Sequence, residues 1–400
     1  MYKMSWHFKQ QSLANVLVSS KGTLAQQESL LKLPLPSLSE TIQKWLPTTL
    51  PHLSQSEYQV TEKMALDFIK EAEPLQKFLS DRQAQTDNWF SEWWLDMAYL
   101  AYRDPLTVWS SPGIVLTPQH FATQEEWLTF AAKLTVAALE YKTNLDLGTI
   151  PVDMSGKNPM DMRQYYRLFG ATRIPGQTKD SQIVNGDSDY IVIAHRGHFF
   201  RLKILDENGN KLSYSQVYQS LCQVLQEVQR QSVESQVGIL TSGDRDSWFQ
   251  SYHALKDAGN VQAIADIENS LFLLCLDSSI SSNESPLAKT AINSLLGHGH
   301  QNGANRWFDK ALQFIVARSG EVAISNEHSF AEAVPTMSMA DFCVDYINKD
   351  QFSSLTSVAT HQPIYIPFEL NDDIRTKIQE ASQKLDRYFF HQSPRNILAS

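Results

Sequence analysis

The stretch that most constrains the fold runs from about residue 185 to residue 275, where strand patterns surround one helical pattern. The segment DYIVIAHRGHFFRLKIL reads as two strands joined by a tight turn at Arg196-Gly197. SYSQVYQSLCQVLQEVQRQ has helical periodicity, and SLFLLCLD is an apolar run typical of a strand buried on both faces. A strand of that kind requires a sheet that other elements cover on each side.

A second pair of strand patterns lies near residues 312–325. LQFIVA and VAIS read as strands on either side of the turn RSGE, so His328 is expected just beyond a strand end, where a side chain can face a cleft. Strands and helices follow one another without a strict βαβ repeat, which predicts a mixed α/β (α+β) fold with a mixed sheet. A chain of 400 residues is too long for one typical core and predicts two domains.

Composition and charge narrow the class of protein. The chain is 42% hydrophobic and 20% charged, and its net charge of -10 argues against nucleic acid as a partner. No apolar run approaches the ~20 residues that a membrane-spanning helix needs. The 3 cysteines lie far apart in sequence, so a disulfide framework is not expected, and Cys275 is predicted to be a core residue.

The first 27 residues contain no Asp or Glu but carry lysine, serine and glutamine. This composition is similar to that of an organelle transit peptide, although arginine is missing; the alternative is a disordered tail. The expected location is mitochondrial, with a peroxisomal or cytoplasmic location as the alternatives.

His328, in NEHSFAEAVP, has three interpretations. An unperturbed imidazole titrates near pH ~6.5 and suits a general base, with Glu332 as a same-face neighbour if the segment is helical. The pattern Ser329-x-x-Glu332 also fits a capping box, in which case His328 merely precedes a helix. A metal site is the weakest interpretation, because no second histidine completes H-E-x-x-H.

The other histidines of interest lie in segments that are predicted to be turns or loops. His298 and His300 have chelate spacing, but the glycines around them favour a loop, and no metal site is predicted. His195 and His198 flank the hairpin tip and are expected in a solvated turn. The aromatic residues from 89 to 102 are expected in a core, with Tyr99 as the exception, since a phenol can donate to a bound carboxylate.

Several motifs, in order along the chain, resemble the choline/carnitine acyltransferase family. NRWFDKALQFIVARSGEVAISNEHSFAEAVP is similar to the family's active-site segment, in which N-R-W-F-D-K, a strand pair and E-H-x-x-A-E-G-x-P follow one another. LPLPSLSETIQKWL, MRQYYRLFGATRIPG and VGILTSGDRDSWFQSY are similar to other family segments, and the likeness covers about residues 30–385. It is stronger to the acetyl-type, carnitine-using members than to the membrane-bound palmitoyl type.

The resemblance implies acyl transfer between coenzyme A and the hydroxyl of carnitine, as in a carnitine O-acetyltransferase, with choline as the alternative acceptor. It implies that His328 deprotonates the hydroxyl, that Glu332 positions the imidazole and that Tyr99 contacts the carnitine carboxylate. It implies acetyl-CoA as a co-substrate, no tightly bound cofactor, and a monomer whose partners are small molecules. The implied fold is that of chloramphenicol acetyltransferase, with two halves of mixed sheet flanked by helices.

The resemblance also divides the chain. Residues 28–85 would be helices of the family's second half, residues 86–375 the catalytic half, and residues 376–400 the start of a second half that is cut short. The remainder of that half carries groups for coenzyme A, carnitine and the oxyanion, so the chain alone is expected to be weakly active or inactive. The competing hypothesis is a non-catalytic acyltransferase-like protein.

Two further expectations follow from the family pattern. In the family, both substrates reach the histidine through a tunnel. Ala333 stands where the family has glycine, and a methyl group at a tight backbone site is expected to narrow this tunnel or strain the turn. The apolar face that packs on the second half would be exposed, which makes association of the chain a liability.

Overall fold

The computed structural model describes residues 22–107, 109–206, 209–231, 235–280, 284–349, 352, 354–356 and 361–391. Residues 1–21 and 392–400 lie outside these ranges, and with them most of the segment predicted to be a transit peptide or a tail. Within the described ranges, none of the helices combines the length and apolarity that crossing a bilayer requires.

Contacts between residues divide the chain into two compact units. One comprises residues 29–98, and the other contains the described residues of 22–28 and those from 99 onward. These two units are defined by contacts within this chain. They do not test the division into residues 28–85, 86–375 and 376–400 that the family resemblance predicts.

The unit of residues 29–98 is helical. The hydroxyls of Ser37 and Ser54 accept hydrogen bonds from the backbone N–H of Glu40 and Glu57, whose carboxylates reach back to complete capping boxes. The elements are α2 (Leu38–Thr49), the 3-10 turn η2 (Leu50–His52), α3 (Gln55–Glu71), α4 (Glu73–Gln85), α5 (Ser91–Trp94) and the π-helical turn η3 (Leu95–Leu100), which crosses its boundary.

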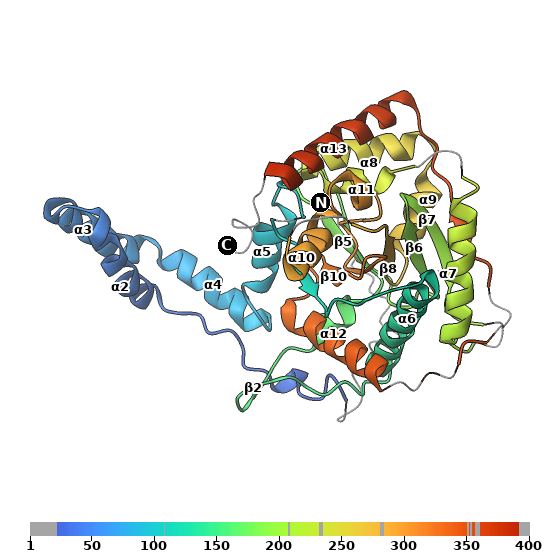
Figure 1. Ribbon diagram of the computed structural model, residues 1–400. Coiled ribbons are helices and arrows are strands. Elements are labelled where there is room, and N and C mark those ends of the chain that lie inside the picture. The colour runs from blue at the N-terminus through green and yellow to red at the C-terminus, as the bar shows by residue number, and fades with distance from the viewer. Residues whose placement is uncertain are drawn as a thin grey trace. The chain divides into compact units, whose positions relative to one another are not determined.

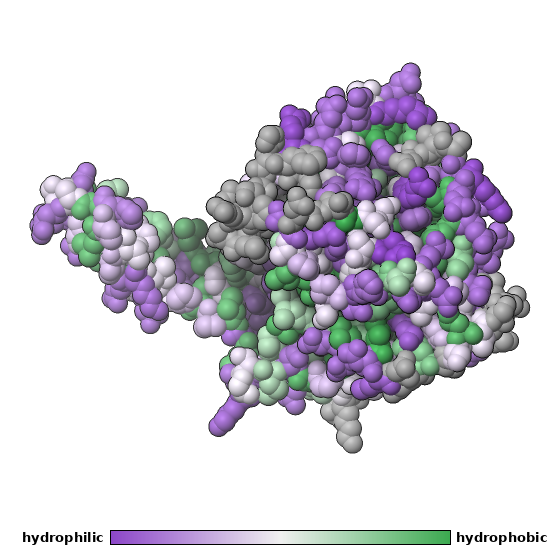
Figure 2. All heavy atoms as spheres, in the orientation of Figure 1, coloured by the Kyte–Doolittle hydropathy of each residue, from purple (hydrophilic) through white to green (hydrophobic). Residues whose placement is uncertain are grey.

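Large apolar side chains remain exposed on these helices, and Figure 2 shows hydrophobic surface along them. The exposed set includes Trp45, Leu50, Val60, Met64, Leu66, Phe68, Leu75 and Phe78. Of the residues from 89 to 102, Leu100 alone is buried, so the aromatic stripe is not the core that the sequence predicts.

The larger unit is built on a mixed sheet (Figure 1). Among the described residues, 7 strands follow the order β1 (Gly113–Val115), β10 (Val322–Asn326), β9 (Leu312–Ala317), β8 (Leu273–Asp277), β6 (Tyr190–His195), β7 (His198–Lys203) and β11 (Ile364–Ile366). β8 runs parallel to β6 and β9, and the other neighbours are antiparallel. The predicted mixed α/β fold is confirmed.

Helices cover both faces of the sheet. Leu274 and Leu276 of β8 pack on one face with α6 (Gln124–Asp146), α7 (Tyr214–Val228) and α12 (Ala333–Asn348). Leu273 and Cys275 pack on the other face with α8 (Arg245–Asp257), α9 (Val261–Glu268), α10 (Pro286–Leu296) and α13 (Asp372–His391). Burial on two sides explains the unbroken apolar run around Cys275 and confirms this cysteine as a core residue.

The β6–β7 hairpin turns where the sequence predicts. Arg196 and Gly197 have φ values of 50° and 75°, the left-handed values that suit a two-residue hairpin turn. The prediction of a solvated turn is wrong for the flanking histidines, since His195 is 9% exposed and His198 is 2% exposed. Burial lowers the pKa of His195, whose Nδ1 lies 2.7 Å from the carbonyl oxygen of Leu276.

Shorter elements complete the larger unit. They are η1 (Gln27–Ser29), the hairpin of β2 (Met154–Ser155) and β3 (Asn158–Pro159), η4 (Arg163–Arg167), the hairpin of β4 (Ala171–Ile174) and β5 (Ser181–Val184), η5 (Val237–Ser242) and α11 (His300–Gly303). The β4–β5 hairpin pairs Arg173 directly with Gln182, so the two side chains lie on the same face.

Candidate active site

His328 lies two residues beyond the end of β10. Pairing with β1 and β9 holds that strand, and the backbone N–H of Glu327 donates to the carbonyl of Ala311 at 3.1 Å. The chain turns at residues 328–330 before α12 begins at Ala333. The His328 side chain remains 29% exposed, whereas Glu327 and Ser329 on either side of it are buried.

The structure brings the three predicted site residues together. Nε2 of His328 lies 3.0 Å from Oε2 of Glu332, and the Tyr99 hydroxyl makes a long hydrogen bond of 3.4 Å to Oε1 of the same carboxylate. The rings of Tyr99 and His328 meet edge to face, with centroids 5.3 Å apart. When Nε2–H donates to the carboxylate, Nδ1 carries the lone pair, and the imidazole can accept a proton there.

The contact between His328 and Glu332 arises from a turn and not from the helix that their spacing suggests. Glu332 is the N-cap residue of α12, and its side chain makes no capping hydrogen bond. The Ser329 hydroxyl donates to Glu327, so the predicted Ser329–Glu332 capping box is wrong. Ala333 is an exposed first residue of the helix without a left-handed φ, so the strain expected from its methyl group does not arise.

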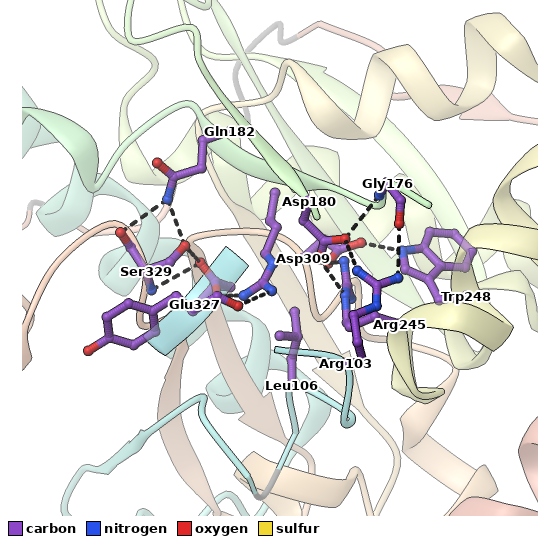
Figure 3. Close-up of polar contacts among 12 residues, drawn as sticks. Arg103, Leu106, Gly176, Asp180, Gln182, Arg245, Trp248, Asp309, Glu327 and Ser329 are labelled. Atoms are coloured by element: carbon purple, nitrogen blue, oxygen red, sulfur yellow. Dashed lines mark hydrogen bonds and ion pairs between the residues drawn. The ribbon is translucent and has the colours of Figure 1, made fainter. Parts of the chain in front are cut away.

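Five charged side chains form what we call the buried ion-pair network: Arg173, Asp180, Arg245, Asp309 and Glu327. Figure 3 labels the last four of them. Arg173 contacts Asp180 at 2.8 Å and Glu327 at 3.1 Å. Arg245 contacts Asp180 at 2.6 Å and Asp309 at 2.7 Å. No side chain of the network is more than 1% exposed, so each charge depends on its partners instead of water.

Burial and the neighbouring arginines shift the pKa values of the carboxyl groups of Asp180 and Asp309 in opposite directions. Burial disfavours ionised Asp180, but Arg245 and Arg173 outweigh it and hold the pKa of Asp180 below its ordinary value. At Asp309 burial prevails over the attraction of Arg245 and raises the pKa to about 6. Arg103, which contacts Asp180 at 3.1 Å, adds positive charge at the edge of the network.

The other histidines singled out in the sequence lie elsewhere. His300 starts the short helix α11, and its Nδ1 lies 2.8 Å from a carboxylate oxygen of Asp386. Within the described part of the chain, no group of three or more His, Cys, Asp or Glu side chains is placed to hold a metal. A cavity of about 440 Å³ lies along α13, lined among others by Arg375, Gln379 and Asp386, and does not include His328.

Sequence reasoning assigned no role to Arg173, Gln182 or Glu327. The available signal was an arginine inside the apolar strand pattern ATRI and a glutamate immediately before His328. A buried charge needs a partner of opposite charge, but the sequence does not say which residue supplies it.

The fold and the site define a mixed α/β protein with a part-exposed histidine–carboxylate pair at the end of a strand. The family model of Choline/Carnitine o-acyltransferase matches residues 33–393. The chain therefore belongs to the choline/carnitine O-acyltransferase family, as its motifs predict.

Relatives include two named carnitine O-acetyltransferase. The protein of Columba livia is 36% identical over 372 residues, which cover 90% of this chain and 59% of that protein. The human protein is 33% identical over 382 residues, covering 93% and 61%. Human choline O-acetyltransferase is 29% identical over 389 residues, covering 92% and 52%. The chain thus spans about three fifths of the length of these carnitine O-acetyltransferases.

Among solved structures, a chloramphenicol acetyltransferase aligns with 62% of this chain and 90% of its own length, at 12% identity and a TM-score of 0.25. A TM-score this low carries no weight. The mixed α/β assignment rests on the sheet and the helices that cover it.

Proposed function

We propose that this chain carries the acid–base centre of an acyltransferase that moves an acetyl or short acyl group between coenzyme A and the hydroxyl of carnitine. Family membership supports the reaction class. The observation that carries the proposal is the His328–Glu332 pair, in which a part-exposed imidazole lies 3.0 Å from a carboxylate.

In the proposed reaction, His328 takes the proton of the carnitine hydroxyl as the oxygen attacks the thioester carbonyl of acetyl-CoA. The new C–O bond forms, the C–S bond breaks, and the departing thiolate receives the proton from the imidazolium. Glu332 stabilises the imidazolium while it exists and holds the ring in one orientation. The reverse reaction uses the same steps, and neither direction needs an acyl-enzyme or a tightly bound cofactor.

Tyr99 is proposed to contact the carboxylate of carnitine. Its hydroxyl already faces a carboxylate, but the 3.4 Å separation from Glu332 is long for an O–H···O hydrogen bond. A substrate carboxylate that offers a shorter bond would therefore compete well for this donor.

Choline is the second candidate acceptor, since relatives named choline O-acetyltransferase match 84–92% of this chain. Choline has the hydroxyl and the quaternary ammonium of carnitine but lacks the carboxylate. Carnitine is the preferred acceptor because the named carnitine enzymes have the higher identity, 33–36% against 29–32% for the named choline enzymes.

The test is a thiol-release assay on the purified chain with acetyl-CoA and either L-carnitine or choline. The expected result is carnitine-dependent release of free thiol that His328→Ala abolishes. A rate equal to buffer with His328 intact would reject catalysis by this chain and favour a non-catalytic role. Faster release with choline than with carnitine would reassign the acceptor.

The proposed location is the mitochondrion, on the acid-free composition of residues 1–27. Fusion of these residues to a fluorescent protein should direct it to mitochondria. A peroxisomal or diffuse cytoplasmic signal would contradict this proposal.

A further inference from the structure

We propose that Arg173 and Gln182, a cross-strand pair of the β4–β5 hairpin, are positioning residues that hold the catalytic turn at His328 from both sides. The proposal rests on the proposed function in taking His328 as the general base. Neither residue contacts the imidazole; each acts through a chain neighbour of His328.

Arg173 holds the residue before the histidine. Its Nη1 lies 3.1 Å from Oε1 of Glu327, whose side chain is fully buried. Its Nη2 donates to the backbone carbonyl of Tyr99 at 2.6 Å. One guanidinium group therefore contacts the residue next to His328 and also the backbone of Tyr99, the second aromatic ring of the site.

Gln182 holds the residue after the histidine. Its Nε2 donates to the Ser329 hydroxyl at 2.7 Å and to the Ser329 carbonyl at 3.0 Å. The Ser329 hydroxyl and backbone N–H in turn donate to Oε2 of Glu327, which joins the two sides. Figure 3 shows Gln182, Ser329 and Glu327 pointing toward one another. The turn is thus closed around the buried Glu327 and Ser329, whereas the side chain of His328 between them is part-exposed.

The hairpin is itself fixed. Nε of Arg173 donates to Asp180 at 2.8 Å, and Asp180 also receives Arg245 at 2.6 Å and Arg103 at 3.1 Å. The side chains of Arg173, Asp180 and Glu327 are fully buried, so water does not compete for the hydrogen bonds that orient them. A planar guanidinium group can direct N–H groups to three acceptors at once, which a lysine ammonium on a flexible stem does not reproduce.

A buried ion pair is weak evidence for stability, because desolvation offsets much of its attraction. What these contacts supply is geometry, and a proton acceptor displaced by ~1 Å can lose on the order of 100-fold in rate. This arginine contacts the residue next to the base and the backbone of Tyr99, where such geometry would matter.

The test compares Arg173→Lys and Gln182→Leu with two matched controls. Arg306→Lys changes an equally buried arginine that pairs with Asp277, outside the buried ion-pair network. Ser181→Ala changes an exposed residue beside Gln182 on the same strand. Each protein is examined by kinetics and by the NMR cross-relaxation between the rings of Tyr99 and His328, which lie 5.3 Å apart.

The expected result is a fall in kcat of about 10- to 100-fold in Arg173→Lys and Gln182→Leu, with KM changed far less and the ring–ring signal lost. The two control variants should keep the wild-type kcat and the ring–ring signal. Unchanged kcat and ring contact in the two variants would overturn the proposal, as would an equal fall in Arg306→Lys, which would indicate general destabilisation. Should Arg173→Lys fail to fold, Gln182→Leu decides.

Failure of the proposed function can be distinguished from failure of this proposal. If the wild-type chain releases thiol no faster than His328→Ala, His328 is not the base. The ring–ring signal still decides whether Arg173 and Gln182 hold the turn, because it does not depend on turnover.

Discussion

Two groups of polar side chains meet at Glu327 and His328, which are neighbours in the chain, and they differ in their contact with water. The site residues His328 and Glu332 are 29% and 55% exposed in their side chains. Asp180 and Arg173 of the buried ion-pair network are fully buried. The exposed pair can be reached by substrate and is in contact with water. The buried pairs cannot be reached and have no solvent to replace a lost partner.

The difference assigns separate tasks to the two groups. An exposed ion pair contributes little to folding, about 0–1 kcal/mol, and is free to change its protonation during a reaction. A buried network whose partners depend on each other responds to the loss of one member with a large destabilisation. Substitutions in the two groups should therefore separate activity from stability.

The largest effect is expected from His328→Ala. Removal of a general base should lower kcat by about 10²–10⁴-fold while the free energy of unfolding stays within about 0.5 kcal/mol, because the side chain is part-exposed. Thiol release and urea unfolding on the same preparation check both expectations. A variant that retains its rate would remove His328 from the mechanism.

Asp180→Ala, unlike His328→Ala, should cause a large loss of stability. It leaves Arg173 and Arg245 buried without their shared partner, which should cost about 3–5 kcal/mol of unfolding free energy. The matched control is Asp81→Ala, which breaks the exposed Lys77–Asp81 pair and should change stability by less than about 0.5 kcal/mol. Similar losses in the two variants would erase the distinction between exposed and buried pairs.

Glu268→Gln should change how stability depends on pH. Burial raises the pKa of Glu268 to about 7 from an ordinary 4.5, although the Tyr252 hydroxyl donates to it at 2.8 Å. Because the folded pKa is the higher one, the stability from the proton is complete below pH 4.5 and is lost as pH rises to about 7.

Glutamine stays neutral, so the variant should match the wild type near pH 4.5 and exceed it by roughly 3 kcal/mol above pH 7. Asp309, Lys256 and Lys310 also face Glu268 and remain in both proteins. Urea unfolding at pH 5 and pH 8 measures the difference, and an equal gap at both pH values would contradict it.

A smaller effect on activity than that of His328→Ala is expected from Glu332→Gln, which replaces the carboxylate 3.0 Å from the imidazole with an amide that can still form a hydrogen bond. Stability should change by about 1 kcal/mol or less, and kcat should fall less than in His328→Ala. Kinetics of the two variants side by side provide the check. A loss equal to that of His328→Ala would make Glu332 as essential as the base.

Local pattern predicted the parts of the fold that depend on neighbours in sequence. LQFIVA and VAIS coincide with β9 and β10, and the turn at Arg196-Gly197 lies where the hairpin requires left-handed φ values. The same reasoning failed at Glu332, because a four-residue spacing is produced by a turn as readily as by a helix. It also failed at His195, whose burial depends on what covers the hairpin tip.

By itself, the sequence determined a mixed α/β protein with Cys275 in its core and His328 just past a strand. These features follow from hydrophobic periodicity and turn residues, which act over a few neighbouring positions. Only the tertiary structure decided which charges meet. Arg173 is separated from Glu327 by 154 residues, and Gln182 from Ser329 by 147. A buried charge requires a partner, but the partner is selected by how the β4–β5 hairpin packs beside the end of β10, and no local pattern encodes that choice.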